Sequence, residues 1–81
     1  MDETKALEWI SDVFAVKGRI LSIRDDRMSV PEWDSLGTLL LLSRLEEDHG
    51  MIISADDVAR IKTVREICEL LNGSKALHKS E

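Results

Sequence analysis

Apolar residues recur at helical spacing near the start of the chain. Leu7, Ile10 and Phe14 follow one another at intervals of three and four residues, which places them on one face of a helix. The pattern extends to the lysine just before Gly18, a residue type that commonly ends helices in the left-handed conformation. The spacing therefore predicts a first helix over residues 3–17.

A second and more apolar stretch covers residues 35–48, and Gly50 can end it. Its leucines fall on more than one face, which is too wide a stripe for an ordinary surface helix. We therefore expect a central or partly exposed helix. Glu46, Glu47 and Asp48 lie at its C-terminal end, where negative charge opposes the helix dipole. They form either a recognition surface or a solvated face that is tolerated at small cost.

Two capping patterns follow the second helix. Ser54 precedes two aspartates, which predicts a short helix over residues 55–61. The stretch Thr63-Val64-Arg65-Glu66 is a complete capping box and opens a further helix that Gly73 closes. Residues 74–81 are mostly polar and are expected to form a flexible C-terminal tail.

Residues 19–33 form a long connection between the first two helices. Apolar side chains are scattered through it, so we expect it to pack across the helices. Pro31 disfavours helical structure at the residue before it, so the second helix cannot begin earlier than the proline.

Together these elements predict an all-α fold, a small antiparallel four-helix bundle with a long loop between helices one and two and a short third helix. Residues 1–73 would form its single domain. The expected core consists of Leu7, Ile10, Phe14, Leu41, Leu42, Leu45, Ile53, Ile61, Val64, Ile67, Cys68 and Leu71.

The composition agrees with this architecture and narrows the range of possible partners. The chain has 81 residues, few aromatic residues and one cysteine, so aliphatic packing without an internal disulfide is expected. Residues 34–57 contain six acidic residues and one basic residue, which disfavours nucleic acid and anionic membranes and favours partners with basic patches. The acidic N-terminal residues do not resemble a signal peptide, and no apolar run is long enough for membrane insertion. We therefore expect a cytoplasmic protein. A monomer is also expected.

Candidate catalytic residues are few. His49 and His78 have no partner at a spacing typical of a metal site or a catalytic triad. Cys68 lies on the apolar stripe of the last helix, which favours a buried side chain over a nucleophile. No metal site and no enzymatic activity are predicted.

The most informative pair is Asp34-Ser35, at the start of the second helix. Either side chain can cap the helix by accepting hydrogen bonds from the free N–H groups of its first turn. A phosphate ester on Ser35 would also lie at the positive end of the helix dipole. From these two residues alone, a simple cap is the plainer interpretation.

The wider sequence resembles the acyl carrier protein family, whose attachment motif is Asp-Ser-Leu. Here the motif is Asp34-Ser35-Leu36, and Leu41, Leu42, Leu45-Glu46-Glu47, Ile53, Ile61 and Thr63-Val64 follow without a gap. The resemblance runs from Trp33 to about Leu71 and implies a bundle of the acyl-carrier type. It also implies that a phosphopantetheinyl transferase attaches 4′-phosphopantetheine to Ser35, and that the arm carries acyl groups as thioesters between partner enzymes.

The resemblance also suggests roles for neighbouring side chains. Asp34 would help cap the second helix and meet the transferase, and Leu36 would offer apolar contact beside the cofactor arm. Leu39 and Leu40 would offer apolar contact to partners, and Glu46 and Glu47 would pair with basic docking patches of acyl-loading and acyl-transferring enzymes.

Some positions differ from carriers that serve fatty-acid synthesis. Gly37 and Leu40 stand where such carriers have acids on the exposed face of the second helix. Trp33 and Gly37-Thr38 are more similar to specialised stand-alone carriers and to aminoacyl (D-alanyl or peptidyl) carriers. The alternatives are therefore an aminoacyl carrier, or an unmodified helical adaptor that binds a partner through its exposed leucines.

Overall fold

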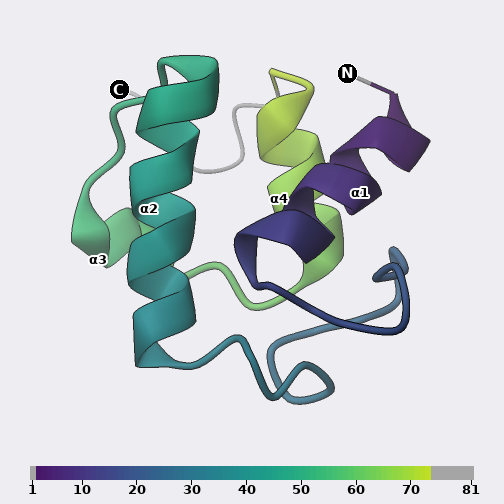
Figure 1. Ribbon diagram of the computed structural model, residues 1–81. Helices are drawn as coiled ribbons and strands as arrows, with labels where there is room; N and C mark the ends of the chain where they lie inside the picture. Colours follow the sequence, from purple (N-terminus) through teal and green to yellow (C-terminus); the bar gives the residue numbers. More distant parts are fainter. Residues whose placement is uncertain (1, 74–81) are drawn as a thin grey trace.

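The computed structural model describes residues 2–73, which form four α-helices (Figure 1). These are α1 (Glu3–Val13), α2 (Ser35–His49), α3 (Ala55–Ala59) and α4 (Val64–Leu71). Helix α1 contacts α2 and α4, and the short α3 contacts α2. The predicted all-α class, with a short third helix, is confirmed. The tail expected at residues 74–81 lies outside the described residues.

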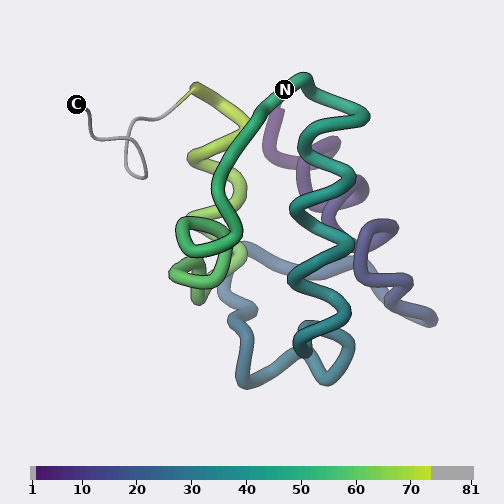
Figure 2. Tube along the Cα trace, turned by 90° about the vertical axis from the view of Figure 1, so that its left-hand side faces the viewer, coloured from purple at the N-terminus to yellow at the C-terminus, as the bar shows by residue number. Residues whose placement is uncertain are grey.

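The helix directions differ in part from a fully antiparallel bundle. In Figures 1 and 2, α1 descends whereas α2 and α4 both ascend. The expected antiparallel arrangement therefore holds for α1 against the other two long helices. It does not hold between α2 and α4, because the connection through α3 carries the chain back to the lower end before α4 begins.

Helix α1 ends earlier than its sequence predicts. It stops at Val13, and the N–H groups of Ala15 and Val16 donate to the carbonyls of Asp12 and Ser11, both at 3.0 Å. This is a Schellman arrangement, and Ala15 holds its left-handed position with φ of 55°. The extension of the helix to the lysine at position 17, with Gly18 as its end, was therefore wrong.

Tertiary contacts explain the early end of α1. The Ser11 hydroxyl donates to the carbonyl of Leu7 at 2.7 Å and accepts from the N–H of Leu21 at 2.8 Å. The Phe14 ring stacks on Trp33, with 5.1 Å between ring centroids. The chain therefore turns where these side chains contact the long connection. Helical periodicity in the sequence does not reveal these contacts.

The other helix ends follow their capping residues. Gly50 ends α2 in the left-handed conformation, with φ of 66°. Ser54 caps α3, and Thr63 caps α4 with the complete capping box that its sequence predicts. Helix α3 is two residues shorter than expected, because the N–H of Ile61 bonds to the carbonyl three residues earlier instead of continuing the helix.

The core confirms most of the predicted residues and adds others from the connection. Leu7, Leu42 and Ile53 are only partly buried. The long connection contributes three fully covered side chains, which confirms that it packs across the helices. The buried hydrophobic residues are Ala6, Ile10, Val13, Phe14, Leu21, Val30, Trp33, Leu41, Leu45, Val58, Ile61, Val64, Ile67, Cys68, Leu70 and Leu71.

Cys68 is a core residue, as predicted. It is 5% exposed, and burial raises the pKa of its thiol above the usual value. A thiol in this environment is mostly protonated at neutral pH and is a poor nucleophile.

Candidate functional site

The site begins with the sharp turn that opens α2. The N–H of Trp33 donates to the carbonyl of Val30 at 2.9 Å, and the Trp33 side chain is 2% exposed. Because the tryptophan is anchored in the core, the two residues after it are held at the surface. Asp34 and Ser35 are both exposed.

Asp34, and not Ser35, is the cap of α2. Its carboxylate accepts a hydrogen bond of 2.9 Å from the N–H of Gly37. Its carbonyl accepts from both the N–H and the hydroxyl of Thr38, at 2.9 and 3.0 Å. With these groups satisfied by Asp34, the Ser35 hydroxyl makes no hydrogen bond to any residue from 2 to 73.

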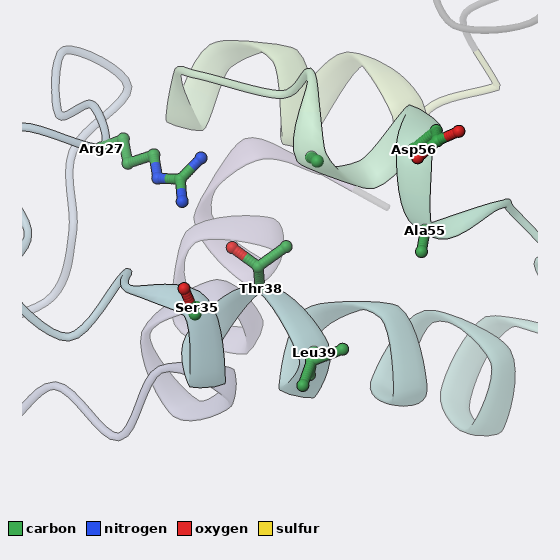
Figure 3. Close-up of a pocket in the computed structure, with 7 residues that line it drawn as sticks. Arg27, Ser35, Thr38, Leu39, Ala55 and Asp56 are labelled. Atoms are coloured by element: carbon green, nitrogen blue, oxygen red, sulfur yellow. The ribbon is translucent and has the colours of Figure 1, made fainter.

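Ser35 faces an open groove of about 370 Å³ between α2, α3 and the long connection. In Figure 3 the serine oxygen points into this space, and the guanidinium of Arg27 approaches it from the opposite wall. The groove is lined by Arg27, Ser35, Thr38, Leu39, Ala55, Asp56 and Ala59.

Leucine side chains surround this end of α2. Leu36 is 64% exposed, Leu39 58% and Leu40 42%. Large apolar side chains clustered on a surface are typical of contact with a partner or ligand. The structure thus brings together Asp34, Ser35 and the three leucines that the sequence singled out.

Gly37 does not lie on the exposed face of α2 with Leu40, so that expectation was wrong. It is buried: a Cβ at this position would overlap the carbonyl oxygen of Glu32 and lie 3.2 Å from a ring carbon of Phe14. A glycine is required here because the turn before α2 passes directly against the helix. An acid could not occupy this position without displacing backbone.

The C-terminal end of α2 is a separate region. Asp48 accepts hydrogen bonds from the Trp9 indole N–H at 2.7 Å and from Arg44 Nε at 2.9 Å. These bonds, the one from Trp9 foremost, hold the pKa of the Asp48 carboxyl below its usual value. Arg44 also pairs with Asp12 of α1 at 3.1 Å. Asp48 therefore connects α2 to α1.

Glu46 and Glu47 differ from Asp48. Both are exposed, and neither forms an ion pair with another described residue. The acidic end of α2 thus divides into one carboxylate with an internal role and two that remain accessible.

The sequence patterns did not identify some of the residues that line the groove. Arg27 precedes Ser35 by eight positions in an irregular segment, so periodicity gave no indication of where its side chain would lie. Ala55 and Ala59 were seen only as part of a short helix. The serine and aspartates around Arg27 predict a turn, but not what that turn faces.

Residues 2–73 contain no cluster of three or more potential metal ligands. None of their helices has the length and apolar character needed to cross a bilayer.

The Ser35 hydroxyl has no hydrogen bond within the described residues, and Arg27 places a positive charge in the groove beside it. This arrangement suits covalent attachment of a phosphate-containing group. In a comparison with protein families, residues 32–71 match the family described as the phosphopantetheine attachment site. Comparisons with curated proteins and with solved structures gave no match. Residues 32–71 therefore belong to the phosphopantetheine attachment family, a relationship shared with acyl carrier proteins, and they form a non-catalytic carrier domain for covalently bound 4′-phosphopantetheine.

Proposed function

We propose that this chain is an acyl carrier protein that holds acyl groups on a 4′-phosphopantetheine arm attached to Ser35. The observation that carries the proposal is the free Ser35 hydroxyl at the start of α2. Ser35 lies within the matched segment, and its hydroxyl faces an open groove. Asp34 supports this role, because it takes over capping of the helix and leaves the serine oxygen without an internal hydrogen-bond partner.

When bound, the group supplies a thiol on a long arm, on which an acyl group is held as a thioester. The residues of the chain position and present that arm. Asp34 fixes the first turn of α2, and its exposed edge, with Leu36, would contact the phosphopantetheinyl transferase. A reducing cytoplasm suits a carrier whose function depends on a free thiol.

Partner enzymes would bind along α2. Leu39 and Leu40 supply exposed apolar contacts beside the arm. Glu46 and Glu47, which have no partner among the described residues, would pair with basic groups on acyl-loading and acyl-transferring enzymes. The free carboxylates and the exposed leucines together support one continuous docking surface on a monomer.

The apolar groove side chains of Leu39, Ala55 and Ala59 support an acyl cargo over an aminoacyl cargo, because they would contact an alkyl chain. Mass spectrometry of the loaded protein isolated from its own cells tests this preference. An aminoacyl group on the arm would contradict it.

The attachment site is tested by incubating the protein with coenzyme A and a broad-specificity phosphopantetheinyl transferase. Intact-mass spectra should show one phosphopantetheine on the wild type and none on Ser35→Ala. Ser43→Ala is the matched control, because Ser43 is an exposed serine on the same helix, and it should be modified fully. Addition to Ser35→Ala, or none to the wild type, would contradict the proposal.

A further inference from the structure

Arg27 occupies one wall of the groove that Ser35 faces. Figure 3 shows its guanidinium directed toward the space above Ser35 and Thr38. Arg27 is the only arginine or lysine among the residues that line this groove. It therefore supplies the positive charge closest to the proposed attachment oxygen within the groove.

The Arg27 side chain has no anionic partner within the described chain. Arg19, Arg44 and Arg60 each form an ion pair with an aspartate, at distances from 2.9 to 3.7 Å. Arg27 forms none of these pairs and yet is partly buried, whereas Arg24 on the same connection is exposed. A partly covered guanidinium without a counterion suits an anion that the chain itself does not provide.

The backbone around Arg27 is fixed by hydrogen bonds to the start of α4. The N–H of Arg27 donates to the carbonyl of Lys62 at 2.9 Å, and the N–H of Val64 donates to the carbonyl of Asp25 at 3.0 Å. Between them, Asp26 and Thr63 form an isolated antiparallel bridge. Arg27 is thus presented from a position tied to a helix, which reduces the entropy lost when its side chain binds a ligand.

The same turn is also braced from within. The Ser29 hydroxyl donates to the Asp25 carboxylate at 2.9 Å, and the Ser29 N–H donates to the carboxylate of Asp26 at 2.9 Å. The Asp25 carboxylate also accepts from the N–H of Ser22 at 2.8 Å and from Arg19 at 3.1 Å. The carboxylates of Asp25 and Asp26 are therefore engaged in holding the turn. Neither of them forms an ion pair with Arg27, and nor does Asp56, which lines the same groove.

We propose that Arg27 binds the phosphodiester of the prosthetic group on Ser35 and thereby directs the arm into the groove toward α3. The inference rests on attachment at Ser35, which would place a negative charge at the groove. Guanidinium groups match phosphate oxygens with two parallel N–H donors. The small side chains of Ala55 and Ala59 leave room beyond the phosphate for the arm, and Leu39 offers it an apolar contact.

The test compares the phosphopantetheinylated wild type with Arg27→Gln, Arg27→Lys and Arg24→Gln. Arg24→Gln is the matched control, because it removes the same charge from the same connection at an exposed position. Intact mass confirms one added group on each protein, and thermal unfolding of the unmodified forms confirms that each variant folds. The readouts are the phosphorus-31 resonance of the phosphodiester and the change in backbone amide shifts at Ala55 and Ala59 on modification.

In Arg27→Gln the phosphorus resonance should move toward that of free pantetheine phosphodiester. The amide shift changes on α3 should fall to about half at low salt, the effect expected for loss of one solvent-accessible ion pair at a partly buried arginine. Arg27→Lys should lie between the two, and Arg24→Gln should match the wild type. Equal spectra for the loaded Arg27→Gln and Arg24→Gln proteins would overturn the role of Arg27 but not attachment at Ser35. Failure to load the wild type at Ser35 would overturn both the attachment and this inference.

Discussion

At the C-terminal end of α2, charged side chains connect the helix to α1, whereas at the N-terminal end the connection to the rest of the fold is apolar. Asp48 and Arg44 meet Trp9 and Asp12 at the first of these ends. At the other, Trp33 packs on Phe14 beneath the turn. Each end is therefore anchored by one tryptophan, by a hydrogen bond in one case and by burial in the other.

This difference leaves different groups accessible at the two ends. Because burial of Trp33 holds the N-terminal end, the Ser35 hydroxyl and the nearby leucines lie outside the core and remain exposed. At the C-terminal end the structure uses Asp48, and only Glu46 and Glu47 remain for partners. Exposed charge on a helix therefore cannot be equated with a recognition surface.

The largest effect is expected from Trp33→Ala. Removing this buried ring should lower the free energy of unfolding by about 3–5 kcal/mol, because it leaves a cavity against Phe14. Urea unfolding measures the change. Labelling of Cys68 by a thiol reagent gives a second measurement, since this buried thiol should react quickly only when the chain opens.

The matched variant is Trp9→Phe, which keeps most of the ring but removes the N–H that donates to Asp48. Its destabilisation should be clearly smaller than that of Trp33→Ala. Equal losses in the two variants would mean that the two ends of α2 are anchored in the same way.

Gly37→Ala should have the next largest effect. The added Cβ would meet the carbonyl of Glu32 and the ring of Phe14, which costs about 1–3 kcal/mol as overpacking. Higher helix propensity of alanine offsets about 1 kcal/mol of this. Ser43→Ala on the same helix is the control and should be neutral or slightly stabilising in thermal unfolding. A Gly37→Ala protein as stable as the wild type would show that the turn can move away from α2.

Local signals in the sequence predicted much of this fold. The capping residues Asp34, Ser54 and Thr63, together with Gly50, define helix ends that depend on a few neighbouring residues. The end of α1 could not be predicted in this way. It depends on the stacking of Phe14 on Trp33 and on the hydrogen bond from Leu21 to Ser11. Both partners belong to the long connection, outside the helical repeat of α1.

A smaller, pH-dependent effect is expected at the C-terminal end. Hydrogen bonds from Trp9 and Arg44 lower the pKa of Asp48, so its carboxylate stabilises the folded chain above the unfolded pKa of about 3.9. That stabilisation is lost as the pH falls through the lower folded pKa. Asp48→Asn should therefore have a lower thermal midpoint at neutral pH and a shallower decline in acid.

The acid decline should not vanish in Asp48→Asn, because the pKa of Asp25 is also lowered, chiefly by the hydrogen bond from the N–H of Ser22. Glu47→Gln is the control, since Glu47 has no ion-pair partner among the described residues, and its acid profile should match the wild type. If Asp48→Asn and Glu47→Gln give the same profile, Asp48 does not connect the two helices.

The candidate site was predictable only where its residues are close in sequence. Asp34, Ser35 and Leu36 form a continuous motif, and the family match covers it. Arg27 and Ala59 reach the groove only because backbone hydrogen bonds place the connection against the start of α4, and α3 packs on α2. Those contacts join distant segments, so no local pattern reveals them.

The smallest effect is expected at Leu40, which belongs to the exposed apolar edge beside Ser35 at the N-terminal end of α2. Leu40 is 42% exposed, and its replacement by glutamate would place an acid where carriers for fatty-acid synthesis have one, without the steric conflict at Gly37. An exposed ion pair contributes about 0.2–1 kcal/mol. Acyl transfer by a fatty-acid synthase that depends on such acids should therefore rise up to several-fold in phosphopantetheinylated Leu40→Glu at low salt, and the gain should fade as salt rises. Leu40→Gln, which removes the same apolar contact without adding charge, should show no gain. If both variants gain equally, or if the wild type is already processed as fast as a typical fatty-acid carrier, the apolar edge beside Ser35 does not determine which partners bind.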